Sequence, residues 1–262
     1  MTIKGKRAVA YFDILGFKNK LLNTPIAELS KDYERLISYT DGEFTLTQGK
    51  ITQRKVCHLY LFSDSLFMIA QEDSEDSFID LITYAWRTMQ QFMVFGFPLR
   101  GAVTYGELYA NFENNIFLGK AISEAVELES RQNWIGAIVD NSAIKQYESV
   151  LHSDNTLGII MNCLLPIYNV PFKDGTRQNH NVINWRVNLV IEDGIKSLFK
   201  NDPYEDSVQE KIDNTLQFSK EVVDLRFAYL NDYVIPERYR TLFAGHKAPS
   251  GGGPLFSNGD EY

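Results

Sequence analysis

The sequence contains few of the residues that form the most easily recognised sites. Of its 262 residues, two are cysteines, Cys57 and Cys163, and four are histidines. The cysteines follow no metal-ligand or redox spacing, so we expect two reduced thiols in a cytoplasmic protein. No histidine is paired with carboxylates at metal-binding spacing, and the sequence contains no recognisable Ser-His-Asp or Cys-His arrangement.

The chain also lacks a surplus of positive charge and a long apolar run. Its formal net charge is −8, which argues against a duplex nucleic acid partner, because binding one requires a concentrated basic surface. Polar or charged residues interrupt every apolar run well short of a membrane span, and the N-terminus has no apolar signal region. We therefore expect a soluble protein with no nucleic acid or membrane partner.

Enough apolar sequence is present for an ordinary globular core. Hydrophobic residues make up 44% of the chain and aromatic residues 13%, and strand-like runs alternate with helical stripes. This alternation predicts an α/β fold or an α+β sandwich, with helices packed on one or both faces of a sheet. The expected strands are residues 7–14, 56–62, 66–70, 99–105, 107–110 and 134–139. The expected helices begin near residue 25, after an N-cap at Asp73 or Ser74, and near residue 119, and the second of them is expected to end before Gly96.

The pattern is weaker after residue 154. Two further strands are predicted at residues 165–170 and 182–191, followed by an amphipathic helix at residues 207–231. The glycine-rich end has no Gly-Lys-Ser/Thr sequence and is predicted to be a flexible tail. We divide the chain into a catalytic-type domain (1–154), strands and a long helix that complete or extend it (155–247), and the tail (248–262).

Two acidic residues lie at the ends of apolar strands. Asp13 closes a strand just before a turn, and Asp64 is at the tip of a predicted hairpin. Such carboxylates are costly to desolvate unless they are paired or bind a cation, and two of them on neighbouring strands can hold two divalent ions. Each could equally well cap a turn or a helix, which aspartate does often. Gly16 favours the first interpretation slightly, because glycine lets the backbone approach a ligand closely.

Four segments resemble the motifs of class III nucleotidyl cyclases, in the family's order. Residues 12–17 (FDILGF) resemble its F-x-D-I-x-G-F motif, and residues 62–65 (FSDS) resemble its Gly-Asp-Ser/Cys hairpin tip. Residues 99–106 (LRGAVTYG) are similar to its R-x-G-I-x-x-G strand, and residues 119–129 (GKAISEAVELE) to its G-x-x-V-N-x-A-x-R-L-E helix. The resemblance implies a ferredoxin-like catalytic domain, here with a C-terminal helical extension, that acts as a homodimer with active sites at the interface.

The resemblance also implies roles for individual residues. Asp13 and Asp64 match the metal-binding aspartates, and the Ile14 carbonyl matches a third ligand for two Mn²⁺ or Mg²⁺ ions. The backbone of Leu15, Gly16 and Phe17 would hold the phosphates of a nucleoside triphosphate. Phe12, from the same motif, and Ser123, from the helix, are further candidates for substrate binding.

Two departures from the family pattern concern the base of the nucleotide. A purine-reading lysine is replaced by Tyr60, and a base-reading acid by Ile116. These changes resemble the bacterial pyrimidine cyclases of Pycsar antiphage defence, which implies UTP, or less readily CTP, as substrate and a separate effector that responds to the product. Tyr60 would then narrow the base pocket, although it could also be an ordinary strand aromatic.

A third departure concerns catalysis. The family's transition-state asparagine and arginine correspond to Ser123 and Glu127, and a glutamate cannot stabilise developing negative charge. Either another cation takes that role, for which Arg100, Lys120 and Arg131 are the candidates, or the site is degenerate. A purine cyclase and an inactive nucleotide-binding module therefore remain alternatives, with Arg100 the preferred catalytic candidate and a possible contact to base or phosphate.

Overall fold

The computed structural model describes residues 1–40, 43–47, 50–54, 56–151, 164–186, 192–199 and 206–230. Cys163, His152, His246 and the predicted tail lie outside these residues. Among the helices that are described, none is both long and apolar enough to cross a membrane.

A four-stranded antiparallel unit forms the centre of the fold. Its strands are β1 (Thr2–Ile14), β4 (Cys57–Phe62), β5 (Ser65–Ala70) and β6 (Leu99–Asn111). They lie in the order β4-β5-β1-β6, so β1 is antiparallel to both β5 and β6. Helices connect β1 to β4 and β5 to β6, which gives the β-α-β-β-α-β ferredoxin-like arrangement. The predicted α/β class and ferredoxin-like core are thus confirmed.

Further strands extend this unit. β8 (Gly136–Val139) pairs parallel with β6, and β10 (Arg177–Val182) and β9 (Ile167–Pro171) continue the sheet beyond it. β7 (Ile116–Leu118) pairs with the far end of β6, and β2 (Glu43–Thr47) and β3 (Lys50–Arg54) form a separate hairpin. The strands after residue 154 therefore belong to the main sheet.

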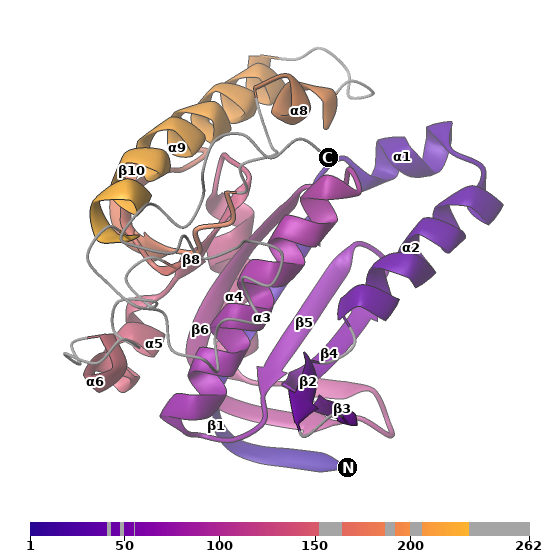
Figure 1. Ribbon diagram of the computed structural model, residues 1–262, viewed down its shortest axis with the longest axis vertical. Coiled ribbons are helices and arrows are strands. Elements are labelled where there is room, and N and C mark those ends of the chain that lie inside the picture. Colours follow the sequence, from indigo (N-terminus) through magenta and orange to yellow (C-terminus); the bar gives the residue numbers. More distant parts are fainter. Residues whose placement is uncertain are drawn as a thin grey trace.

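Helices cover both faces of the sheet (Figure 1). α1 (Phe17–Asn23), α2 (Ile26–Thr40) and α3 (Glu75–Val94) follow or precede the strands of the central unit. α3 begins at Ser74, whose side chain accepts a hydrogen bond from the Ser77 N–H, as expected for an N-cap. α4 (Lys120–Arg131) packs on the opposite face, over β6 and β1.

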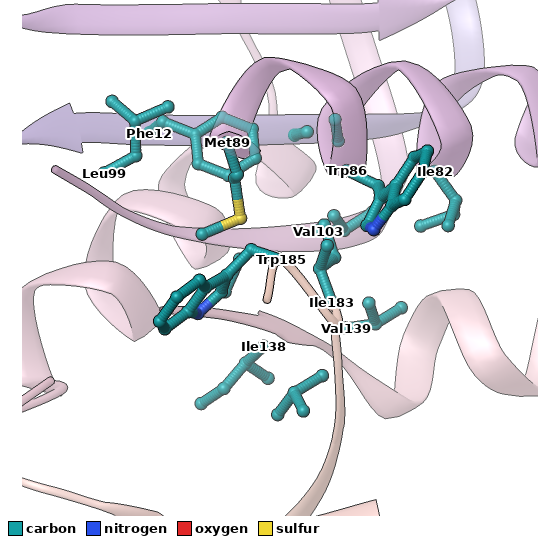
Figure 2. Close-up of a cluster of buried hydrophobic side chains, with 14 of the residues drawn as sticks. Phe12, Ile82, Trp86, Met89, Leu99, Val103, Ile138, Val139, Ile183 and Trp185 are labelled. Carbon is teal, nitrogen blue, oxygen red and sulfur yellow. The ribbon is translucent and has the colours of Figure 1, made fainter. Parts of the chain in front are cut away.

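Apolar residues from these elements form the core. Phe12 alternates with Asp13 along β1, so its side chain faces α3 and is fully buried. Figure 2 shows the centre of this cluster, where side chains of α3 meet those of the strands. The labelled members are Phe12, Ile82, Trp86, Met89, Leu99, Val103, Ile138, Val139, Ile183 and Trp185.

The C-terminal helix α9 (Asp206–Leu230) is attached to the sheet by polar bonds as well as apolar contacts. The Thr215 hydroxyl accepts a hydrogen bond from the Ile135 N–H at 2.9 Å, and the Asn214 amide donates to the Asn133 carbonyl at 2.9 Å. Phe218 packs against Trp134 and Trp185. Three short helices, α5 (Asn141–Gln146), α6 (Glu148–Leu151) and α8 (Glu192–Ser197), complete the described elements.

The structure corrects two sequence predictions and adds a strand that was not predicted. Residues 99–105 and 107–110 were predicted as two strands, but β6 runs unbroken because Gly106 keeps an extended backbone while pairing with Arg7. The strand predicted at residues 182–191 is corrected in its described part. β10 ends at Val182, and residues 183–186 form no strand, although the Ile183 N–H still donates to the Ala137 carbonyl at 2.9 Å and Trp185 is buried in the core. Residues 187–191 lie outside the described residues. β7, a three-residue strand, has too short a pattern to be recognised.

Gly101 provides a test of the packing between β1 and β6. A Cβ atom there would lie 2.3 Å from Phe12 Cδ1 and 2.4 Å from the Tyr11 carbonyl oxygen. We expect Gly101→Ala to lower the free energy of unfolding by about 1–3 kcal/mol, the usual cost of overpacking, as measured by urea denaturation. Gly106→Ala on the same strand is the control, because its nearest neighbour would be 3.5 Å away. Equal stability of the two variants would contradict this packing.

Candidate active site

The pairing of β1 with the β4–β5 hairpin brings Asp13 and Asp64 together. Asp13 pairs with Ser65, the residue that follows Asp64 in the chain. The Ile14 N–H donates a hydrogen bond of 2.9 Å to the Asp64 carbonyl oxygen, so the end of β1 is bonded to the tip of the hairpin. The two aspartates therefore lie at the same end of adjacent strands.

The hairpin tip has an unusual backbone. Ser63 adopts φ 56°, in the left-handed region that residues other than glycine rarely enter. The Tyr33 hydroxyl of α2 donates to the Ser63 carbonyl at 3.3 Å and so supports this turn. Burial, together with the negative charges of Asp64 and Asp13, raises the pKa of Tyr33. Sequence reasoning missed Tyr33, which had looked like one more member of the apolar stripe of α2.

The carboxylates fit a divalent cation electrostatically. Burial raises the pKa of Asp13, the positive charge of Arg100 opposes this shift, and the like charge of Asp64 adds to it. A cation bound between the two carboxylates would offset the desolvation cost of the Asp13 charge and its repulsion by Asp64. The described residues contain no group of three or more His, Cys, Asp or Glu side chains that could hold a metal ion. Two carboxylates nevertheless suffice for Mg²⁺ when substrate phosphates supply further oxygen ligands.

The turn after Asp13 presents backbone rather than side chains. Gly16 is at the N-cap of α1 with φ 73°, and no side chain caps this helix start. Leu15 and Phe17 are buried in the core. The Leu15 N–H already donates to the Pro98 carbonyl at 2.9 Å, so the N–H groups of Gly16 and Phe17 are the ones suited to a phosphate. The side chain of Phe12 points away from this end, into the core.

The side chains of the two residues expected to read the base, Tyr60 and Ile116, have different surroundings. The Tyr60 ring packs on Phe117 of β7, with 4.7 Å between centroids, and Phe117 stacks parallel to Phe67. Ile116 precedes Phe117 on a strand, so its side chain points to the other side of β7. Tyr60, Phe67 and Phe117 thus form an aromatic wall on the α4 face. Phe117 was missed because β7 was not predicted.

The exposed face of α4 carries Ser123 and Glu127, which are separated by one helical turn and are both exposed to solvent. Lys120 forms a 3.3 Å ion pair with Glu124 at the start of this helix. At its end, the Arg131 guanidinium lies 5.2 Å from the ring centroid of Phe172. Neither of these two cations is thus in the place where the family has its arginine.

Arg100 lies beneath α4 and is 7% exposed. Its Nε donates to Glu129 at 2.6 Å and its Nη1 to the Gln132 carbonyl at 3.1 Å, while its Nη2 is 4.0 Å from Asp13 Oδ2. A further cation, Lys173, follows β9. The backbone N–H of Lys173 donates to the Arg131 carbonyl at 2.8 Å. Burial and the charge of Arg100 lower the pKa of Lys173, while Glu129 and Asp13 raise it. Lys173 lies in sequence whose pattern gave no indication of a site.

Comparison with known proteins adds little. No protein-family model and no curated protein matches this sequence. Among solved structures, the adenylyl cyclase CyaB from P. aeruginosa is similar over 72% of this chain and 99% of its own, with 11% identity and a TM-score of 0.48. A guanylyl cyclase domain of the RhoGC fusion protein from Blastocladiella emersonii gives 10% identity, 70% and 96% coverage and a TM-score of 0.42.

A third structure, an adenylate/guanylate cyclase/hydrolase from Silicibacter pomeroyi, gives 13% identity, 70% and 96% coverage and a TM-score of 0.38. These scores and identities are too low for any of the three structures to indicate the function of this chain.

The raised pKa of Asp13 predicts that its charge destabilises the isolated fold. In the folded protein the pKa of this carboxyl lies above its ordinary value of 3.8. The free energy of unfolding therefore falls as the pH rises through the raised pKa. We expect the metal-free Asp13→Asn variant to melt at a higher temperature than the wild type at pH 7, with a gain that shrinks toward pH 4.

The matched control is Asp76→Asn, on the exposed first turn of α3, which should show no such gain. For a chain of this size, 1 kcal/mol corresponds to about 2–4 °C in melting temperature. A lower melting temperature for Asp13→Asn at pH 7 would mean that the carboxylate is satisfied by the protein itself.

Proposed function

We propose that this chain is a nucleotidyl cyclase, a phosphorus–oxygen lyase that converts UTP, or less readily CTP, to the 3′,5′-cyclic monophosphate and pyrophosphate. The observation that carries the proposal is the meeting of Asp13 and Asp64, from two separate family-like motifs, at one end of the sheet. Two aspartates that each only capped a turn would not need to lie beside each other.

The reaction needs a charge arrangement that this site supplies. The ribose 3′-oxygen attacks the α-phosphorus, its proton leaves, and the bond to the β-phosphate oxygen breaks to release pyrophosphate. Two divalent ions bound by Asp13, Asp64 and the Ile14 carbonyl would lower the pKa of the 3′-hydroxyl and neutralise phosphate charge. The N–H groups of Gly16 and Phe17 would hold the terminal phosphates and so orient the α-phosphate for attack.

The aromatic wall supports a pyrimidine as the base. The rings of Tyr60 and Phe117 occupy the region where the family's purine cyclases have a lysine, and Ile116, in the position of the family's base-reading acid, has no carboxylate and points to the other side of β7. A smaller pocket without charged groups suits a single ring better than a purine. The cyclic pyrimidine product would then be a signal for a separate effector protein in antiphage defence of the Pycsar type.

The exposed part of the α4 face supports a homodimer that completes the site. Phe62, beside the hairpin tip, is 71% exposed, and Val126 on α4 is 36% exposed. A second copy packed on this face would cover these apolar side chains and bring Ser123 and Glu127 of one chain toward the aspartates of the other. One observation favours an inactive nucleotide-binding module: Glu127 is exposed where the family has an arginine.

A direct assay tests the activity. The purified chain is incubated with each of the four labelled nucleoside triphosphates and Mn²⁺, and the products are separated. We expect cyclic UMP or cyclic CMP from the wild type and at least about 100-fold less from Asp64→Ala, since each 1.4 kcal/mol of lost transition-state stabilisation costs a factor of ten. Asp76→Ala, which removes an exposed carboxylate far from the site, should retain activity.

Each other outcome selects an alternative. A cyclic purine product would retain the cyclase and overturn the argument from Tyr60. Nucleotide binding without any cyclic product would support the inactive nucleotide-binding module instead. If the chain neither binds a nucleotide nor forms a cyclic product, the proposal as a whole is contradicted.

The role of Tyr60 has its own test. We expect Tyr60→Ala to shift the ratio of purine to pyrimidine turnover toward purine by about tenfold or more, the usual effect of enlarging a pocket. Tyr109→Ala is the control, because Tyr109 is a half-buried tyrosine on β6 that faces away from α4. An unchanged ratio in Tyr60→Ala would show that this ring is an ordinary part of the sheet.

A further inference from the structure

A buried ion pair lies directly behind Asp13. Arg100 comes from β6 and Glu129 from the last turn of α4, and the two side chains are 8% and 5% exposed. Their contact, Nε to Oε1, is 2.6 Å long, and the Gln132 carbonyl accepts a second bond from Nη1. The planar guanidinium is thus held by two partners, one at Nε and one at Nη1.

The remaining nitrogen of Arg100 forms a long ion pair with Asp13 but no hydrogen bond. Nη2 lies 4.0 Å from Asp13 Oδ2, which is beyond hydrogen-bonding distance. Asp13 pairs with Arg100 in the sheet register, so a small rotation of an unrestrained arginine would suffice for a hydrogen-bonded ion pair. The bonds to Glu129 and Gln132 oppose that rotation.

A hydrogen-bonded Arg100–Asp13 ion pair would conflict with cation binding. It would occupy a carboxylate oxygen that a divalent ion needs, and the unneutralised guanidinium would repel the ion. Glu129 neutralises Arg100 at close range, and a second nearby cation, Lys173, makes that neutralisation more important. With Glu129 uncharged, Asp13 would face two positive charges.

We propose that Glu129 is a positioning residue that holds Arg100 away from Asp13 and so leaves the Asp13 carboxylate free to bind a divalent cation. The inference rests on the proposed metal site of Asp13 and Asp64. It gives Arg100 a role behind the metal ligand in place of a contact to the base or the phosphates.

The test measures Mn²⁺ binding by the full chain without nucleotide, through the electron paramagnetic resonance signal of free Mn²⁺. We expect Glu129→Gln to weaken binding by about tenfold or more, the usual effect of losing a group that orients a metal ligand. Glu107→Gln is the matched control, because it removes the same charge from an exposed position of β6 that faces away from α4. It should bind Mn²⁺ as the wild type does.

The double variant R100Q/E129Q separates positioning from other roles. Removing both charges leaves no guanidinium to capture Asp13, so its Mn²⁺ affinity should return to within about threefold of the wild type, and replacing a buried ion pair by neutral groups is often tolerated. If Glu129 were itself a ligand, or only a structural brace, the double variant would bind as weakly as Glu129→Gln. Should Glu129→Gln not fold, weak binding by a folded double variant overturns the proposal.

The outcomes also distinguish this inference from the proposed function. Asp64→Asn should abolish the Mn²⁺ binding of the wild type. If the wild type binds no Mn²⁺, or if Asp64→Asn binds it equally well, the metal site fails and the role of Glu129 fails with it. If the metal site holds but Glu129→Gln binds like the wild type, only the positioning role is overturned.

Discussion

The antiparallel pairing of β1 with β5 and β6 is the constraint on which the rest of the site depends. It places Asp13 beside the hairpin tip that carries Asp64, and it places Arg100 opposite Asp13 on the other neighbouring strand. Because strand register fixes which side chains share a face, a slip of one residue would turn Asp13 into the core and Phe12 into the site. The fully buried core face of β1 makes such a slip very costly.

A consequence of this register is a row of charges from the hairpin tip to α4, in which two negative charges are followed by a positive and a further negative one. Asp64 and Asp13 stand at the open end, Arg100 lies behind Asp13, and Glu129 lies behind Arg100. Each inner charge is partnered within the protein, whereas the negative charge of Asp64 adds to the burial that raises the pKa of Asp13. The excess of negative charge is thus concentrated where a cation and a triphosphate would enter.

Much of the fold could be predicted from the sequence, because its strands and helices are long and strongly periodic. The hairpin with Asp64 at its tip, the helix α3 ending before Gly96 and the helix α9 were all expected near their observed bounds. β7 and the departure of Trp185 from the sheet could not be predicted, since three residues carry no period and a buried tryptophan fits either arrangement. β2 and β3 were likewise not expected.

The site shows the same division. The two aspartates were predicted from motifs as metal ligands, but neither motif could show that Arg100 is bound to Glu129, because the two residues are 29 positions apart. Three further residues reach the site from segments whose sequence patterns are apolar or irregular: Phe117, Tyr33 and Lys173. Their contribution depends on tertiary packing that local sequence does not encode.

The most direct test of the central claim is a crystal structure of the chain soaked with Mn²⁺ and a non-hydrolysable UTP analogue, recorded at the manganese absorption edge. The account predicts an anomalous peak in contact with carboxylate oxygens of both Asp13 and Asp64, with the analogue's phosphates over the Gly16–Phe17 backbone. An anomalous peak elsewhere, or Asp13 hydrogen-bonded to Arg100 with no metal between the aspartates, would contradict it.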